Sequence, residues 1–298
     1  MKNISYYVSM FFYLQFGSQV FGSVLPENNL HLRANGKHST ITEEEFYKGI
    51  DQVSEFYRPV VESYGVTLVV TKNWDDEDVN AYADRDNDKN EWKVLVNGGL
   101  ARDGAMTLDG LTFVMCHEFG HHLAGYPFFL RGNWAAAEGQ ADYFAGFVCL
   151  PELWKNELEI NASFRSTTTG IAKEKCDLAW STTERQNICY RIAHAALPIA
   201  QITSKIYGTK APSFDRQDRS QVKSTILYHA DGQCRLDTTI NGANCLAIFD
   251  LGIIPGRMHE EGQESVKAEE IAAETSCLRA SEYKNGFRSR CWFKPRLN

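Results

Sequence analysis

The stretch "CHEFGHHLAGY", residues 116–126, determines how the rest of this sequence is interpreted. It contains the pattern His-Glu-x-x-His through His117, Glu118 and His121. Residues four apart lie one above the other on one face of an α-helix, so the two imidazoles can bind one Zn²⁺ without distorting the backbone. Glu118, one position round the helix, can reach the water beside such a metal. A helix that carries histidines by chance is the alternative, and the surrounding sequence distinguishes the two.

A second segment, "NWAAAEGQADYFAG" (133–146), offers the third protein ligand that a catalytic zinc needs. Glu138 follows His121 closely enough for a second helix to pack against the first. Asp142 lies four residues further on, on the same helical face, where it can accept the N–H of a ligating imidazole. Carboxylates in so apolar a helix usually have a neutralising partner, which favours a metal site over a solvated acidic stripe.

The first residues are typical of an export signal. Lys2 precedes a mostly apolar core at residues 6–16, and Val20 and Gly22 are small residues at the positions that a cleavage after Gly22 requires. The apolar run is short for a bilayer span, and no later run reaches the roughly 18 residues of a spanning helix. We therefore expect residues 1–22 to be a signal peptide, the protein to be secreted or periplasmic, and no stable membrane insertion after signal removal.

Charge and cysteine content narrow the function classes further. A net charge of −7 with scattered basic residues argues against nucleic acid as the main partner. Eight cysteines in an exported chain indicate disulfides, and the absence of a C-x-x-C pair disfavours zinc binding by thiols. Connectivity cannot be read from the sequence, but the simplest pairs are Cys116–Cys149, Cys176–Cys189, Cys234–Cys245 and Cys277–Cys291.

Hydrophobic periodicity and turn residues predict an α+β fold. An amphipathic helix is expected at 42–64, begun by a Thr42–Glu45 capping box and disturbed near Pro59. The other predicted elements are strands at 66–70, 80–85 and 91–97 and helices at 107–125, 133–150 and 185–207, the second of these helices starting at Asn133 and stopped by Pro151. We expect residues 23–207 to form the core and 208–298 to be a Cys-bearing extension packed on it and stapled by disulfides.

The combination of "HEFGH" with "EGQAD" resembles the H-E-x-x-H…E-x-x-A-D pattern of gluzincin metallopeptidases, and is most similar to the group containing HtpX and the CAAX prenyl proteases. "VNAYAD" (79–84) and "VLVNGGLAR" (94–102) also resemble blocks of that family, so the resemblance covers about residues 60–150. It implies a zincin-like domain, a small twisted sheet packed on the two motif-bearing helices. It also implies His117, His121 and Glu138 as ligands of one Zn²⁺ per chain, with Glu118 as catalytic base.

Two features depart from that family. Members such as HtpX are embedded in membranes, whereas this chain carries only a signal. The family's downstream Thr-His-Pro segment has no counterpart in "GTKAPSFDR" (208–216). The donor that stabilises the developing oxyanion is therefore open. The candidates are His194, Arg191, His229, Tyr228, Arg216 and Arg219. Arg191 and His194 are slightly preferred because they share one helix at a spacing of three, and His122 is expected to be structural.

The resemblance implies zinc-dependent hydrolysis of peptide bonds in a peptide or protein substrate. The substrate is expected to add as an extended strand to an edge strand at 91–97, with Asn97, Gly98 and Gly99 lining its approach. Two alternatives remain: a zinc-containing binding or inhibitory protein without catalysis, and a zinc hydrolase of a non-peptide amide such as a cell-wall component. Residues 23–41 are short for an inhibitory propeptide and contain no Cys that could bind the zinc.

Overall fold

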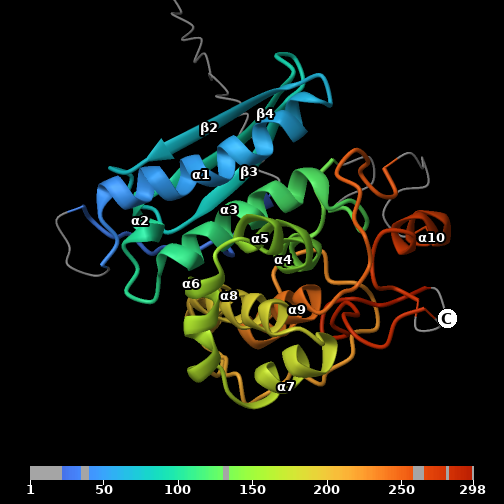
Figure 1. The fold of residues 1–298 in the computed structure, drawn as a ribbon. Helices are drawn as coiled ribbons and strands as arrows, with labels where there is room; N and C mark the ends of the chain where they lie inside the picture. The colour runs from blue at the N-terminus through green and yellow to red at the C-terminus, as the bar shows by residue number, and fades with distance from the viewer. Residues whose placement is uncertain (1–21, 35–39, 130–133, 258–264, 280–281, 297–298) are drawn as a thin grey trace, which may run out of the picture.

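The computed structural model describes residues 22–34, 40–129, 134–257, 265–279 and 282–296. The predicted signal peptide, except Gly22, and the predicted helix start at Asn133 lie outside the described residues. Within them the chain is α+β, as the sequence predicts, with one small sheet and many helices (Figure 1).

Four strands form the sheet in the order β1-β3-β4-β2. Strand β2 (Thr67–Asn73) runs parallel to β4 (Glu91–Asn97), and β4 pairs antiparallel with β3 (Ala81–Asp86). The short β1 (Gly22–Ser23) pairs antiparallel with β3 on its other side. The three strands predicted from hydrophobic patterning are confirmed to within a few residues, and β1 was not predicted.

The expectation that strand 91–97 forms the edge of the sheet is wrong. Strand β4 is hydrogen-bonded to β3 on one side and β2 on the other, so it has no free edge. Asn97 is buried at its end, and Gly98 and Gly99 begin the short helix α2 (Gly98–Ala101). A Cβ on either glycine would lie within 2.1 Å of a neighbouring backbone carbonyl oxygen, so both serve the close packing of α2. The parallel pairing of β2 with β4, which periodicity cannot reveal, makes β2 one outer strand, and on the other side β3 is covered only by the two-residue β1.

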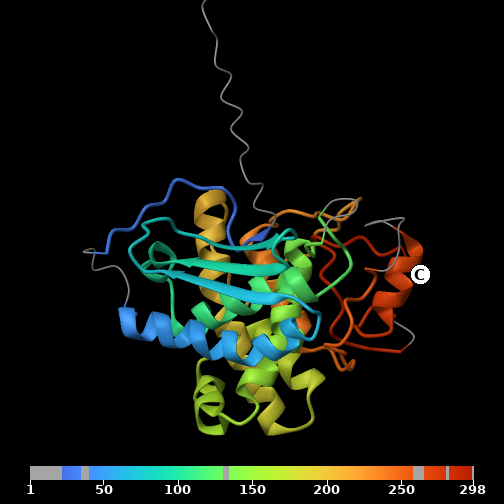
Figure 2. The ribbon, with the colours of Figure 1, turned by 90° about the horizontal axis from the view of Figure 1, so that it is seen from above.

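Helices α1 (Glu43–Glu62) and α3 (Leu108–Leu123) pack on the sheet, and the rest of the helical part lies below it in the view of Figure 1. Figure 2 shows the same arrangement from above, with α1 running along the strands. The predicted capping box of α1 is present, with Glu45 N–H donating to Thr42 and the Glu45 carboxylate accepting from Thr42 N–H. Helix α1 continues past Pro59, and Val61 in its last turn is still buried in the core.

The second motif-bearing helix begins later and ends later than predicted. Helix α4 (Glu138–Phe144) continues through a π-helical turn, η1 (Ala145–Cys149), into α5 (Leu150–Trp154). Residues 135–137 do not join the helix because their backbones bond elsewhere: Ala136 N–H donates to the His121 carbonyl at 2.9 Å and Ala137 N–H to the Pro127 carbonyl at 2.7 Å. Pro151 does not end the helix. It lies in the first turn of α5, where a proline is tolerated.

The remaining helices complete the body below the sheet. They are α6 (Leu158–Ser163), the 3₁₀ turn η2 (Phe164–Ser166), α7 (Gly170–Ala179), α8 (Thr183–Tyr207), α9 (Gly232–Ala243) and α10 (Val266–Ala273). Helix α8 matches the prediction for 185–207 and runs through Pro198 to the left-handed cap at Gly208. Helix α9 packs against α8, α4 and η1, so part of the predicted extension lies inside the packed body. None of the described helices is long and apolar enough to cross a membrane.

All eight cysteines form disulfides. The predicted pairs Cys116–Cys149 and Cys176–Cys189 are confirmed. The other two predictions are wrong, because the structure pairs Cys234 with Cys291 and Cys245 with Cys277. Helix α9 explains the difference: Cys234 lies in its first turn and Cys245 beyond its end, so an intervening helix separates them by about 16 Å.

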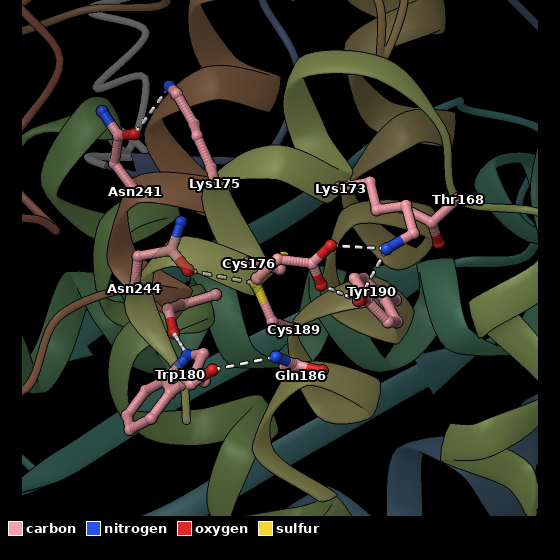
Figure 3. Close-up of a disulfide and its surroundings, with 12 residues drawn as sticks. Thr168, Lys173, Lys175, Cys176, Trp180, Gln186, Cys189, Tyr190, Asn241 and Asn244 are labelled. Carbon is pink, nitrogen blue, oxygen red and sulfur yellow. Dashed lines mark hydrogen bonds and ion pairs between the residues drawn. A yellow bond between two sulfur atoms is a disulfide. The ribbon is translucent and has the colours of Figure 1, made fainter. Parts of the chain in front are cut away.

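The Cys176–Cys189 disulfide joins α7 to α8 within a polar network (Figure 3). Gln186 donates a 2.9 Å hydrogen bond to the Trp180 carbonyl, and the Trp180 indole N–H donates to the carbonyl of Ala243, the last residue of α9. The network therefore fastens α7, α8 and the end of α9 together. Because all eight cysteines are paired in these four disulfides, no cysteine thiol is free to bind a metal.

Candidate metal centre

Helix α3 places the two histidines of the first motif on one face. Its N-cap is Thr107, whose hydroxyl accepts the Gly110 N–H, so the helical phase is fixed about two turns before the motif. His117 and His121 are fully buried, and their Nε2 atoms lie 3.1 Å apart. The spacing of four residues brings the two rings together, as predicted.

Glu138 from α4 completes the cluster. Its Oε2 lies 3.0 Å from Nε2 of His117 and its Oε1 lies 3.6 Å from Nε2 of His121. Four ligands placed tetrahedrally at 2.0–2.1 Å from one metal ion are separated by about 3.3 Å, so these atoms fit around a single ion. The two helices can approach this closely because α3 carries Gly120 where a Cβ would lie 2.9 Å from the Cα of Ala141.

The Nδ1 atoms of both imidazoles, which face away from Glu138, already have hydrogen-bond partners. His117 Nδ1 lies 2.8 Å from the Asp142 carboxylate, and His121 Nδ1 donates to the Ala136 carbonyl at 2.7 Å. These contacts direct both Nε2 atoms at Glu138, with the tautomer that a metal ligand requires. Arg235 of α9 donates two 2.8 Å hydrogen bonds to Asp142, one to each oxygen. The predicted role of Asp142 behind a ligand thus agrees with its position.

The charges of these side chains favour a bound cation. Burial opposes ionisation of Glu138, but His229 and His121 outweigh it and hold its pKa well below the usual value. Burial lowers the pKa of His121 to about 4, so its imidazole is neutral. Burial also disfavours the charged form of His117, yet Asp142 and Glu138 raise its pKa to about 9. Carboxylates that stabilise a proton on a buried imidazole would equally stabilise a divalent cation bound in place of that proton.

Glu118 lies next to this cluster without a hydrogen-bond partner for either carboxylate oxygen. The side chain is fully buried, and burial raises its pKa to about 8. A buried carboxylate without partners is unusual in a folded protein and is a mark of a functional group. Its position beside the ligands suits a base that acts on water near the metal.

A histidine from outside both motifs also reaches the cluster. His229 precedes α9, and its Nε2 lies 3.2 Å from Oε2 of Glu138. The segment is held there because Leu227 accepts the Glu138 N–H at 3.1 Å and Tyr207 donates to the His229 carbonyl at 3.3 Å. His229 was one of the less favoured oxyanion donors in the sequence, and Tyr228 beside it is largely exposed against Phe129.

The two preferred donors lie elsewhere. Arg191 binds Asp109 with two 2.8 Å contacts and Glu157 with one of 2.7 Å. Asp109 is in the first turn of α3, about 12 Å along the helix from His117. His194 packs against the rings of Phe164 and Phe214. Neither contacts the metal cluster, because α8 crosses the other end of α3.

His122 is structural, as predicted. Its ring stacks between Trp92 and Trp134 with centroid distances of 5.1 and 4.8 Å, and its Nε2 bonds the Lys93 carbonyl. Burial and the neighbouring Arg85 keep its pKa well below the usual value, so it is a neutral core histidine.

The segment Gly22–Leu25 lies directly on the cluster. Gly22 and Ser23 pair with Ala83 and Tyr82 of β3, and the Val24 N–H donates to the Ala81 carbonyl at 3.1 Å. Leu25 exchanges two hydrogen bonds with the Asn80 side chain, at 3.0 and 3.1 Å. Gly22, Val24 and Leu25 are buried, so a segment of the chain itself occupies the edge of β3 beside the metal ligands.

Comparison of this chain with models of protein families, with curated proteins and with solved structures finds no match. The functional interpretation therefore rests on the geometry of the site.

Sequence reasoning missed two parts of this centre. Arg235 and the segment Gly22–Leu25 belong to no motif. The sequence offers one weak indication that Arg235 is buried with a partner: α9 contains only one other charged residue, Asp237. The sequence indicated Gly22 only as the end of a signal peptide and gave no sign that Gly22–Leu25 lie on the cluster, because that position depends on pairing with β3.

Proposed function

We propose that this chain is a zinc-dependent metalloendopeptidase of gluzincin type. The single observation that carries the proposal is the convergence of His117, His121 and Glu138 around one point, with the unpartnered carboxylate of Glu118 beside it. Binding a metal ion does not by itself require a buried base, and keeping the Glu118 carboxylate buried without hydrogen-bond partners lowers the stability of the fold. This argues for catalysis and against a binding or inhibitory protein.

Each side chain has a role in hydrolysis. Zn²⁺ held by His117, His121 and Glu138 would supply Lewis acidity, polarising the scissile carbonyl and making water more acidic. Glu118 takes a proton from the attacking water and passes it to the leaving nitrogen. His229 donates a hydrogen bond to the carbonyl oxygen as negative charge develops. Asp142, held by Arg235, keeps His117 in one tautomer and orientation.

The occupied edge of β3 supports a peptide substrate. An extended main chain fits there with antiparallel pairing to Tyr82 and Ala83, and the Asn80 side chain binds the following residue. This is the mode in which extended peptides add to a sheet edge. A cell-wall amide would not use these backbone hydrogen bonds. We therefore place the substrate on β3, in place of the predicted strand 91–97.

We also propose that the protein is exported, to a secreted or periplasmic location. Four disulfides are typical of an oxidising compartment, where thiols are not kept reduced. The predicted signal at residues 1–22 agrees with this location.

The proposal is tested with full-length protein, wild type beside Glu118→Gln. Zinc content is measured by atomic spectroscopy, and hydrolysis is measured with unfolded casein. Glu152→Gln is the matched control, because it removes a partly exposed carboxylate whose ion pair, among the described residues, is with Lys155. We expect about one zinc per chain in all three proteins, with casein cleavage by the wild type and Glu152→Gln only.

Other outcomes separate the alternatives. Full zinc occupancy with no cleavage of casein or of any peptide would favour the binding protein. A well-folded chain that takes up no zinc would remove the basis of the proposal. Equal cleavage by Glu118→Gln would remove Glu118 as the base.

A further inference from the structure

The peptide bond between Ser23 and Val24 lies in the candidate active site. The Ser23 carbonyl oxygen accepts a 2.7 Å hydrogen bond from Nε2 of His229. The Ser23 N–H donates to Oε1 of Glu138 at 3.5 Å. Ser23 is preceded by Gly22, where a Cβ would lie 2.6–2.9 Å from the His121 ring, so the backbone passes directly over a metal ligand.

The nitrogen side of the same bond is held as well. The Val24 N–H donates to the Ala81 carbonyl at 3.1 Å, and the Val24 backbone lies beside the Glu118 carboxyl. The next carbonyl, that of Val24, accepts a hydrogen bond from Arg235. Thus the carbonyl faces a donor, the amide nitrogen lies beside the base, and both flanking segments are fixed. This is the arrangement of donor, base and peptide bond that hydrolysis of a bound peptide requires.

We propose that the Ser23–Val24 bond is the first substrate of this site and that the chain cleaves itself there. The inference rests on the proposed function. Water adds its hydroxyl to the Ser23 carbonyl carbon and loses a proton to Glu118. The bond from that carbon to the Val24 nitrogen breaks, and the proton is delivered to this nitrogen. The products are a carboxylate on Ser23 and a new amino terminus at Val24.

We expect the reaction to be intramolecular, because Ser23 is half-buried and the residues on either side of it are buried. Gly22 is buried, and the side chains of Val24, Glu118 and His121 are fully inaccessible to solvent. After cleavage Val24 and Leu25 remain paired with Ala81 and Asn80 on β3. A later substrate must take over these pairing positions, so it competes with the chain's own residues for the same edge.

The test follows the amino terminus of the full chain, wild type beside Glu118→Gln. Both proteins are purified with a chelator, then given zinc, and samples are analysed by intact mass and amino-terminal sequencing. We expect the wild type to convert to a chain that starts at Val24, at a rate independent of protein concentration. Glu118→Gln should keep Ser23, and trace wild type added to it should not remove Ser23. Glu152→Gln should convert like the wild type.

Zinc content and circular dichroism establish that Glu118→Gln is folded, and a second variant guards against misfolding of the first. His229→Ala removes the donor to the Ser23 carbonyl and should slow the conversion at least tenfold. A wild type that cleaves casein but keeps Ser23 would overturn self-cleavage while leaving the proposed function intact. A zinc-loaded wild type that cleaves neither would overturn both. A Val24 terminus in both the wild type and Glu118→Gln would show that another protease makes the cut, and would also overturn self-cleavage.

Discussion

His117 Nδ1 lies 2.8 Å from Oδ1 of Asp142, and Arg235 donates to both oxygens of the same carboxylate. Burial alone would raise the pKa of Asp142, but Arg235 and His117 outweigh it and lower the pKa to about 2. Asp142 is therefore an anion at neutral pH, and it accepts the His117 N–H. The orientation of one metal ligand thus depends on the packing of α3, α4 and α9.

Replacing Asp142 with Asn should weaken zinc binding by about 10–100-fold, because the amide orients His117 less firmly and leaves Arg235 without its anion. The measurement is competition for zinc with a chromogenic chelator at pH 7.5. Asp177→Asn is the control, since it makes the same chemical change in the partly exposed pair with Lys173. Unchanged affinity in Asp142→Asn would mean that this carboxylate does not support the ligand.

Replacing His229 with Ala should lower kcat for peptide hydrolysis by about 10²–10³-fold, with little change in KM and full zinc content. The reason is that its hydrogen bond to the carbonyl oxygen strengthens as negative charge develops. His194→Ala is the matched control, because that ring packs against Phe164 and Phe214 away from the cluster. If His194→Ala loses activity and His229→Ala keeps it, the assignment made from the structure is reversed.

Non-reducing peptide mapping should recover Cys234 linked to Cys291 and Cys245 linked to Cys277. A peptide linking Cys234 to Cys245 would contradict the helical path of α9. The Cys234–Cys291 bond closes a loop of 57 residues, so replacing both cysteines with Ala should lower the free energy of unfolding by about 4 kcal/mol. Urea unfolding of the double variant beside the wild type gives this value.

Asp237 should make stability fall with rising pH. Burial raises its pKa to about 6 from 3.8, although the Asp218 N–H and Gln233 donate to it. The folded state therefore binds a proton that the unfolded chain has already released between pH 4 and 6. This contribution is fully present below pH 4 and is lost as the pH rises through 6, by roughly 2–3 kcal/mol.

Asp237→Asn cannot titrate, so the wild type should lose this amount relative to the variant between pH 4 and pH 7. Urea unfolding of both proteins at the two pH values isolates the effect, because titration of the metal ligands cancels in the difference. A difference that stays constant with pH would show that Asp237 is ionised in the folded protein throughout.

Local patterns in the sequence were sufficient for the α+β class, three of the four strands of the sheet, the positions of α1, α3 and α8, and the grouping of His117, His121 and Glu138. They were sufficient because helical spacing and strand alternation are short-range properties. The start of α4 and the edge of the sheet were predicted wrongly. In both cases the deciding hydrogen bonds come from outside the segment, at His121 and Pro127 for α4 and at β2 for the sheet.

The sequence by itself determined which side chains can hold a metal, since the i, i+4 spacing of His117 and His121 fixes their relation on any helix. Only the tertiary structure decided what surrounds them. Arg235 reaches Asp142 across 93 residues, and His229 reaches Ser23 across 206. Contacts at such separations depend on how whole helices and strands pack, because no local backbone preference links residues so far apart along the chain.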